Sequence, residues 1–148
     1  MKGSIIMDYE ITNTMTPEEY MEMRRIVGWG LFPLEQAQEG LNNSYILICL
    51  REKGKPIALG RVVSDHGYIF YIADVIVCPD YQGQGLGRKI MEMIMSSIYD
   101  LLKPGYRAMI SLSSAKGKEE FYNKFGFKNR PDDDVGCGMY QWIEKQDV

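Results

Sequence analysis

The chain has 148 residues, 45% of them hydrophobic and 25% charged, and its formal net charge at pH 7 is −3. This length and composition predict one ordered globular domain over residues 1–148, with a buried core. The acidic balance argues against nucleic acid or a membrane surface as a partner. No apolar run is long enough to span a bilayer, and the apolar patch within residues 1–7 is too short for a signal peptide, so we expect the cytoplasm.

Three cysteines stand at positions that show no pairing pattern. Cys49, Cys78 and Cys137 are odd in number and lack the Cys-x-x-Cys spacing of zinc and redox sites. We therefore predict free thiols in a reducing compartment, and no metal site.

The first elements along the chain are a strand and a helix. Residues 8–12 alternate between polar and apolar and predict a strand. The sequence Thr16-Pro17-Glu18-Glu19 supplies an N-cap, a proline at the first helical position and acidic residues in the first turn, so a helix is expected to run to Val27. Its apolar positions leave Arg24 and Arg25 on the outer face.

A short helix and three strands are expected next. Gly28-Trp29-Gly30 breaks the first helix, and a second helix is predicted over residues 34–41. Apolar runs bounded by turn residues then predict strands over 45–50, 57–63 and 68–77.

The segment 86–102 has the clearest helical periodicity in the chain. Its apolar residues fall on one side, which is expected to pack on the sheet, as far as Leu101 and Leu102. A strand over 108–112, a helix over 116–125 and final strands at Phe127 and at 139–143 are expected to follow.

A glycine-rich turn joins the strand that ends at Val77 to the helix that begins at Leu86. Such a turn leaves backbone N–H groups without partners at the positive end of a helix dipole, where an anion such as a pyrophosphate can bind. The glycines follow the pattern G-x-G-x-G, so the turn lacks the G-x-G-x-x-G of dinucleotide-binding proteins. The Lys-Ser/Thr pair of a P-loop is also missing.

The turn instead has the form Q-x-x-G-x-G, from Gln82 to Gly87. With the preceding run Val-Ile-Val-Cys-Pro-Asp-Tyr, it resembles the cofactor-binding motif of the GNAT superfamily of acetyl-coenzyme A dependent N-acetyltransferases. A second stretch, from Glu120 to Phe127, resembles the later motif of that family, a tyrosine four residues before Gly-Phe. The resemblance implies a mixed α/β fold, with a central, mostly antiparallel sheet flanked by helices, and acetyl-coenzyme A as co-substrate.

The resemblance also implies which residues bind the co-substrate. The strand residues Val75, Ile76 and Val77 would pair with the pantetheine arm, and the main chain at Ile76 or Val77 would be the oxyanion donor. The pyrophosphate would be held by the turn, through Gln82, Gly83, Gln84, Gly85, Leu86, Gly87 and Arg88. The alternative is a simple connecting turn with an exposed arginine.

Two residues are candidates for acid and base catalysis. Tyr122 is the general acid that the resemblance implies, and a core tyrosine is its alternative. Asp74 lies on the same side of its strand as Ile76 and Cys78, in an otherwise apolar segment. It is either the base, directly or through water, or a satisfied structural carboxylate, and the residues leave both roles open. The family often has an asparagine seven residues before the tyrosine, where this chain has Ala115.

Three further residues have both a functional and a structural interpretation. Trp29 either lines an acceptor pocket or fills the core. His66 is expected to be a solvated turn residue rather than a catalytic one. Cys78 is expected to be a packed thiol, because its neighbours include no activating base for a two-step route.

These observations predict an N-acetyltransferase in which a primary amine, of a small molecule, attacks acetyl-coenzyme A directly. The acceptor could instead be a protein N-terminus or a lysine, since the fold does not choose among amines. A non-catalytic acyl-coenzyme A sensing module and a nucleotide-binding regulatory domain are the alternatives from other classes. A homodimer is compatible with the resemblance.

Overall fold

Five strands form one sheet in the order β1-β2-β3-β4-β5, in a computed structural model that describes residues 8–147. The strands are β1 (Glu10–Thr12), β2 (Ile46–Glu52), β3 (Lys55–Ser64), β4 (Ile69–Val77) and β5 (Met109–Leu112). The pairs from β1 to β4 are antiparallel, and β5 runs parallel to β4. This arrangement confirms the predicted mixed and mostly antiparallel sheet.

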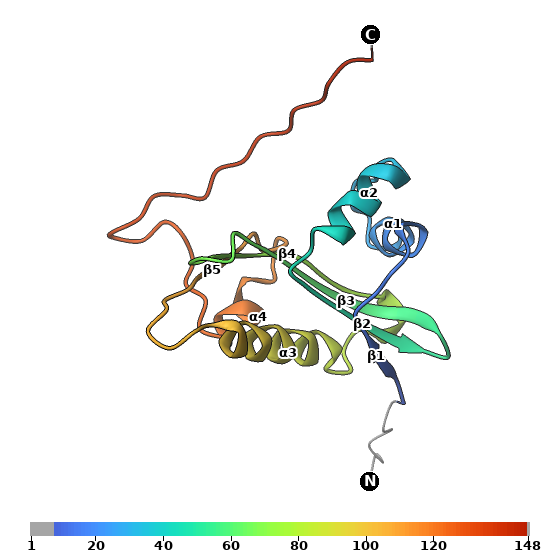
Figure 1. Ribbon diagram of the computed structural model, residues 1–148, viewed down its shortest axis with the longest axis horizontal. Coiled ribbons are helices and arrows are strands. Elements are labelled where there is room, and N and C mark those ends of the chain that lie inside the picture. Colours follow the sequence, from blue (N-terminus) through green and yellow to red (C-terminus); the bar gives the residue numbers. More distant parts are fainter. Residues whose placement is uncertain (1–7, 148) are drawn as a thin grey trace. The chain divides into compact units, whose positions relative to one another are not determined.

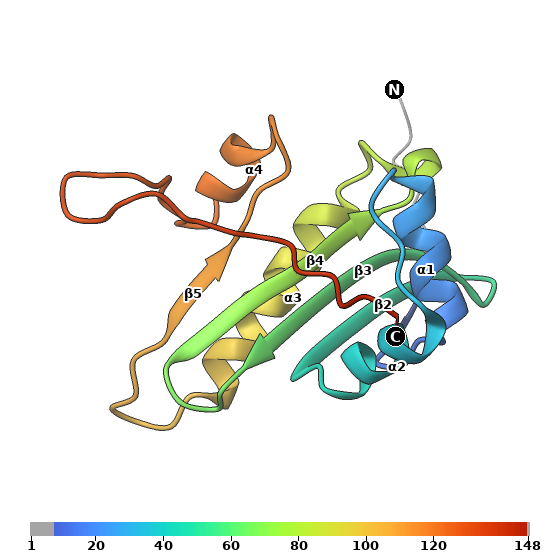
Figure 2. The same ribbon diagram turned by 90° about the horizontal axis from the view of Figure 1, so that it is seen from above.

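Helices cover both faces of this sheet. The helices α1 (Pro17–Ile26) and α2 (Leu34–Asn42) lie on one face, and α3 (Leu86–Leu101) lies on the other (Figure 1). A 3-10 turn, η1 (Pro79–Tyr81), and a short helix, α4 (Glu119–Asn123), complete the elements of the described chain. Figure 2 shows β4 and β5 running side by side at the edge of the sheet away from α1 and α2.

The chain forms two compact units, which divide after Leu112. The first holds the whole sheet with α1, α2 and α3, and the second holds α4 and the segment that follows it. The single domain expected over residues 1–148 stays a prediction. No helix in the described part of the chain combines the length and the apolar composition needed to cross a membrane. The apolar patch within residues 1–7 lies outside the described residues.

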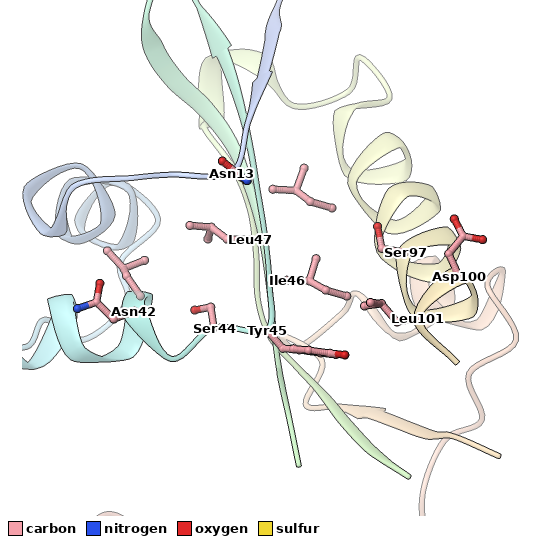
Figure 3. Close-up of a pocket in the computed structure, with 11 residues that line it drawn as sticks. Asn13, Asn42, Ser44, Tyr45, Ile46, Leu47, Ser97, Asp100 and Leu101 are labelled. Atoms are coloured by element: carbon pink, nitrogen blue, oxygen red, sulfur yellow. The ribbon is translucent and has the colours of Figure 1, made fainter. Parts of the chain in front are cut away.

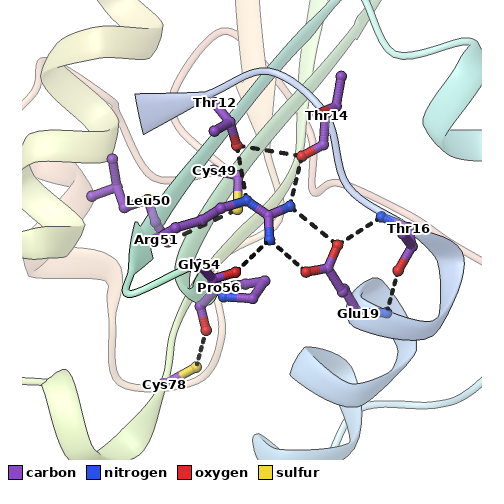
Figure 4. A network of polar contacts seen from close by, with 10 residues as sticks. All are labelled: Thr12, Thr14, Thr16, Glu19, Cys49, Leu50, Arg51, Gly54, Pro56 and Cys78. Atoms are coloured by element: carbon purple, nitrogen blue, oxygen red, sulfur yellow. Dashed lines mark hydrogen bonds and ion pairs between the residues drawn. The ribbon is translucent and has the colours of Figure 1, made fainter. Parts of the chain in front are cut away.

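The start of α1 is fixed by a capping box that is tied to β2. The Thr16 hydroxyl accepts a hydrogen bond from the Glu19 N–H at 3.1 Å, and the Glu19 carboxylate accepts one from the Thr16 N–H at 3.0 Å. The guanidinium of Arg51 donates to both oxygens of the Glu19 carboxylate (Figure 4). It also donates to the Thr12 hydroxyl and to the Thr14 carbonyl, so one side chain joins β2 to the chain between β1 and α1.

The other face of the sheet packs tightly against α3. Ile90 and Ile94 are fully buried, and both lie over Gly60 on β3. A Cβ at Gly60 would lie 2.6 Å from Cγ2 of Ile90 and 2.9 Å from Cδ1 of Ile94. The missing side chain at this position therefore sets how closely the helix approaches the sheet.

The expected elements of the first unit are confirmed to within one or two residues, with two exceptions on their helix faces. Arg24 was expected on the outer face of α1, but only 12% of its side chain is exposed. The arginine turns inward because Asp74 lies beneath α1 and offers it a carboxylate. Leu101 was expected on the buried face of α3, but it is 46% exposed because the helix ends there and its last turn extends past the core.

The expectations for the second unit were partly wrong. The predicted helix over 116–125 is only five residues long, because Gly117 adopts a φ of +85° and delays its start to Glu119. The predicted strands at Phe127 and at 139–143 are absent from the described residues, where no ladder partner pairs with these segments. The side chains of Met139, Tyr140 and Ile143 are more than 80% exposed, so no sheet face buries them.

We predict that Gly60→Ala lowers the free energy of unfolding by about 1–3 kcal/mol, because the new methyl group overlaps two buried isoleucines. Urea denaturation checks this. The matched control is Gly40→Ala in α2, where the added Cβ meets only Nη1 of Arg61, at 3.9 Å. The control should be neutral or stabilising by up to about 1 kcal/mol, since alanine favours the helix. Equal effects of the two substitutions would contradict the packing argument.

We predict that the Glu19 carboxylate makes a pH-dependent contribution to the free energy of unfolding. The hydrogen bond from Arg51 holds the pKa of Glu19 below its ordinary value of 4.5. The folded pKa is depressed, so this contribution is present above pH 4.5 and is lost as the pH falls through the lower folded value. Urea denaturation should therefore show Glu19→Gln less stable than the parent at pH 7 by about 1 kcal/mol, and equally stable near pH 3.

The control for this titration is Glu39→Gln, which changes an exposed carboxylate on α2. Its effect on stability should stay within about 0.5 kcal/mol at both pH values. A loss of stability in Glu19→Gln that persists unchanged at low pH would show that the ion pair with Arg51 is not its cause.

Candidate functional site

β4 contains one residue more than β3 can pair with. Arg61 pairs with Asp74 and Val62 pairs with Ile72, so Ala73 has no partner on β3. An unpaired residue of this kind is a β-bulge, which reverses the side of the strand to which all later backbone groups point. The bulge lies immediately before the residues for which a co-substrate role was predicted.

The bulge turns the main chain of Val75 and Val77 toward the open side of β4. The Cys78 N–H donates to the Ile57 carbonyl at 2.9 Å, so the alternation of antiparallel pairing directs the N–H of Ile76 to β3 and those of Val75 and Val77 away from it. β5 pairs with β4 only as far as Ile72. Among the described residues, no backbone acceptor pairs with the N–H of Val75 or Val77.

The glycine-rich turn follows directly on this open strand end. Gly83 and Gly85 have φ values of +77° and +83°, a conformation that glycine adopts without strain, and Gly85 is the N-cap of α3. A Cβ at either glycine would meet no atom within 4 Å, so the space over the turn is open. The backbone N–H groups of residues 83–88 have no acceptor within the described chain. Unpaired N–H groups at a helix N-terminus, below open space, fit a bound pyrophosphate.

The two long side chains of the turn have different environments. The Gln82 side chain donates from Nε2 to the Val77 carbonyl at 3.0 Å, so it fastens the turn to the strand end. Arg88 is 73% exposed in its side chain and pairs with Glu92 one turn later in α3, at 2.9 Å. Its charge is therefore held at the helix N-terminus and is accessible to an anion.

Asp74 has hydrogen-bond partners on both carboxylate oxygens. Oδ2 accepts from the Tyr20 hydroxyl at 2.5 Å and from Nε of Arg61 at 2.7 Å, and Oδ1 accepts from Nη1 of Arg24 at 3.2 Å. The residue is 3% exposed and faces α1. Burial raises the pKa of the Tyr20 phenol, and so does the neighbouring carboxylate. Burial alone would lower the pKa of Arg61, but Asp74 outweighs it and the net pKa is raised.

Trp29 belongs to the same cluster. The guanidinium carbon of Arg24 lies 5.4 Å from the ring centre of Trp29, 4.9 Å from that of Phe32 and 5.8 Å from that of Tyr20. Three aromatic faces therefore surround a cation that is bound to the Asp74 carboxylate. Trp29 itself is half-buried, so part of its ring remains accessible.

Tyr122 lies in the second unit, on α4. Its ring contacts those of Phe121 and Phe127, with centroids 5.0 and 6.4 Å apart. Burial raises the pKa of its phenol, and within the described chain no group forms a hydrogen bond with the hydroxyl. The phenol therefore stays protonated at neutral pH and its proton is not already donated to a protein acceptor.

The chain matches known acetyltransferases in sequence and in structure. Residues 42–129 match the family model described as acetyltransferase (GNAT) domain, and these residues are more than half of the 148. An uncharacterized N-acetyltransferase, ycf52, of Porphyra purpurea is 31% identical over 90% of this chain and 78% of its own length. A solved structure of a probable acetyltransferase from meticillin-resistant Staphylococcus aureus is 34% identical, with a TM-score of 0.81 over 92% of this chain and 100% of that one. The chain belongs to the GNAT acetyltransferase family.

Other GNAT relatives are longer than this chain. It spans 66% of the length of the ycf52 protein of Pyropia yezoensis, which is 33% identical. It spans 52% of the length of histone acetyltransferase TAP1 of Glycine max, which is 34% identical. The matches confirm the family predicted from the glycine turn and the Tyr-Gly-Phe stretch, while the acceptor is not decided by them.

The surroundings of Cys78 and His66 favour structural roles over catalytic ones. Cys78 is buried, its thiol lies 3.7 Å from the Pro56 carbonyl, and burial raises its pKa, which disfavours the reactive thiolate. His66 is exposed in a turn and its ring lies 4.1 Å from that of Tyr45. Within residues 8–147, no group of three or more His, Cys, Asp or Glu side chains is arranged to hold a metal ion.

A pocket of about 630 Å³ lies at the start of β2, which extends beyond its pairing with β1 (Figure 3). It is lined by residues from the end of α2, from the connection to β2, from β2 itself and from the last turns of α3, including Ser44, Leu47 and Asp100. The glycine turn is at the first turn of α3. The pocket is therefore separated from the opening beside β4 by the length of the helix.

Sequence reasoning missed the residues that hold Asp74. Arg61 carried a signal, because a cation within an apolar strand needs a partner. Arg24 carried a weaker one, since it follows Tyr20 by one helical turn and so shares its face. Ala73 carried none, because no residue type marks a bulge reliably.

We predict that Asp74→Ala lowers the free energy of unfolding by about 3–5 kcal/mol, because it leaves two largely buried guanidinium groups without their carboxylate. Urea denaturation checks this, and Asp74→Asn, which keeps an acceptor oxygen, provides a milder variant. The control is Glu22→Ala, which removes the exposed pair with Arg25 and should cost less than about 1 kcal/mol. A loss below about 1 kcal/mol for Asp74→Ala would show that the cluster is not stabilising.

Proposed function

We propose that this GNAT chain transfers the acetyl group of acetyl-coenzyme A to a primary amine of a small molecule by direct attack. The observation that carries the proposal is the opening beside β4, where the N–H groups of Val75 and Val77 point away from β3 and the glycine turn follows directly. An extended amide-containing arm can pair with the strand there, and its pyrophosphate can bind the N-terminus of α3.

The register favours one of the two residues expected as oxyanion donor. The N–H of Ile76 is directed to β3, whereas that of Val77 faces the opening. We therefore assign the Val77 N–H as the donor to the thioester oxygen, with Val75 as the strand residue that pairs with the arm. Bound acetyl-coenzyme A supplies the reactive thioester, and the nitrogen–carbon bond forms as the carbon–sulfur bond breaks.

Tyr122 is proposed as the general acid. A phenol whose pKa is raised by burial remains a proton donor throughout the neutral range. It would give its proton to the leaving thiolate sulfur and recover one from water. Its hydroxyl is available because no protein acceptor within the described chain holds it.

Of the two roles expected for Asp74, we propose the structural carboxylate rather than the catalytic base. Taking a proton would place a neutral acid between two guanidinium groups and remove the charge that pairs with both. Its contacts instead support a carboxylate that fixes α1 on β4, next to Val75. The amine then loses its proton to water, so the rate should rise with pH toward the pKa of the amine.

The proposed acceptors are supported by the names of two relatives and by the position of Trp29. A serotonin N-acetyltransferase 2 of Oryza sativa is 34% identical over 60% of this chain, which favours a small amine. The soybean relative named histone acetyltransferase favours a protein lysine as the second candidate. Trp29 is proposed to line the acceptor site, because its partly accessible ring lies in the loop that follows α1. Two relatives are named chloroplastic, so a plastid is the alternative to the cytoplasm as the location.

A thiol-release assay with acetyl-coenzyme A tests the proposal against small amines, polyamines and lysine-containing peptides. Turnover confined to small amines supports it, and turnover on peptides alone selects the protein acceptor. Coenzyme A binding without turnover on any amine would identify a sensing module, and the absence of coenzyme A binding would reject the site.

We predict that Tyr122→Phe lowers kcat by about 10²–10³-fold, because the thiolate must then leave without a positioned acid. The dissociation constant for coenzyme A should change less than threefold, since the phenol is not assigned to its binding. The control is Tyr99→Phe, at an exposed tyrosine on α3 that is 78% accessible, which should match the parent. A kcat unchanged in Tyr122→Phe would exclude the phenol as the acid.

A further inference from the structure

The glycine turn has a side-chain contact with a distant part of the sheet. The Tyr81 hydroxyl, at the end of η1, donates a hydrogen bond to the carboxylate of Glu52, the last residue of β2. The two residues are 29 positions apart in the chain. Tyr81 is half-buried and packs against the core formed beneath α1.

The other attachments of this turn are local. The Tyr81 N–H donates to the Cys78 carbonyl, the Gln82 N–H donates to the Pro79 carbonyl, and the Gln82 side chain reaches Val77. Within the described chain, the bond from Tyr81 to Glu52 is the one side-chain hydrogen bond that joins residues 79–85 to an element other than the adjoining strand β4. The contact therefore resists a movement of the whole turn that local bonds would allow.

Because of its glycines, the turn depends on outside contacts to keep one conformation. Gly83 and Gly85 have open space around them and no side chain to pack, so the turn has little internal resistance to other conformations. Its N–H groups bind an anion tightly only when they already converge, because ordering the turn on binding costs free energy. The Glu52 carboxylate is hydrogen-bonded to Tyr81, two positions before Gly83, and its negative charge alone would disfavour an anion at the turn. A favourable effect of Glu52 on anion binding must therefore come from holding the turn in place.

We propose that Glu52 and Tyr81 are positioning residues, which hold the glycine turn with its N–H groups directed at the diphosphate of coenzyme A. The proposal rests on the function proposed above for the same turn. Neither residue needs to touch the ligand, because Tyr81 acts on the turn and Glu52 acts through Tyr81.

The test combines Tyr81→Phe, Glu52→Ala, the double variant and Glu52→Gln, with Tyr99→Phe as the matched control. Calorimetry should show a five- to tenfold higher dissociation constant for coenzyme A in Tyr81→Phe and in Glu52→Ala. The double variant should show the same increase as either single variant. Non-additivity is expected because both changes remove one bond. Glu52→Gln keeps an acceptor and should lie within about threefold of the parent. KM for acetyl-coenzyme A should rise while kcat changes less than twofold.

Two results would overturn the proposal. Tighter binding in Glu52→Ala and Glu52→Gln would show that the carboxylate acts only as a repelling charge. Additive losses in the double variant would show that the residues act separately.

Hydrogen exchange of the ligand-free protein separates this proposal from the proposed function. Exchange at the hydrogen-bonded N–H groups of Gln82 and Lys89, whose acceptors are the Pro79 and Gly85 carbonyls of the turn, should be faster in Tyr81→Phe and Glu52→Ala than in the parent and in Tyr99→Phe. If the parent binds no coenzyme A, the proposed function fails, and the exchange result alone then supports or rejects the anchor. Unchanged exchange in both variants would reject it.

Discussion

The extra residue in β4, Ala73, is the constraint on which both sides of the site depend. Before it, Ile72 pairs with Val62 on the face that packs against α3, and after it Asp74 pairs with Arg61 on the face that packs against α1. Without the bulge, the two-residue period of a strand would place Asp74 on the face of Ile72. The buried side chains of α3 are all apolar, so a carboxylate there would have no partner.

The same shift determines what the edge of β4 offers to a ligand. It moves Val75 and Val77 into the positions whose N–H groups point away from β3, at the point where pairing with β5 has ended. One inserted residue therefore produces a charged cluster on one face and unpaired backbone donors at the edge. The cluster in turn fixes α1 against the strand through Arg24, which limits how far the edge can move.

The sequence predicted correctly the elements that depend on local patterns. It did not predict the features that depend on strand pairing or on distant partners. The capping box at Thr16 and the apolar stripe of α3 are local patterns, and both elements formed as expected. The inward turn of Arg24 depends on a partner 50 positions away, so helical periodicity alone placed it wrongly. The segment 139–143 has strand-like composition, yet a strand exists only where another strand pairs with it, and composition cannot supply that.

The candidate site shows the same division. The spacing of Gly83 and Gly85 predicted a turn with exposed N–H groups, and the structure has it, because positive φ values follow from glycine itself. Choosing Val77 over Ile76 required the register, since adjacent residues in a strand differ only in the direction of their N–H groups. The contact between Tyr81 and Glu52 likewise links residues that no spacing rule connects. A motif therefore specifies which groups can bind, whereas pairing and long-range contacts decide which of them face the ligand and how firmly they are held.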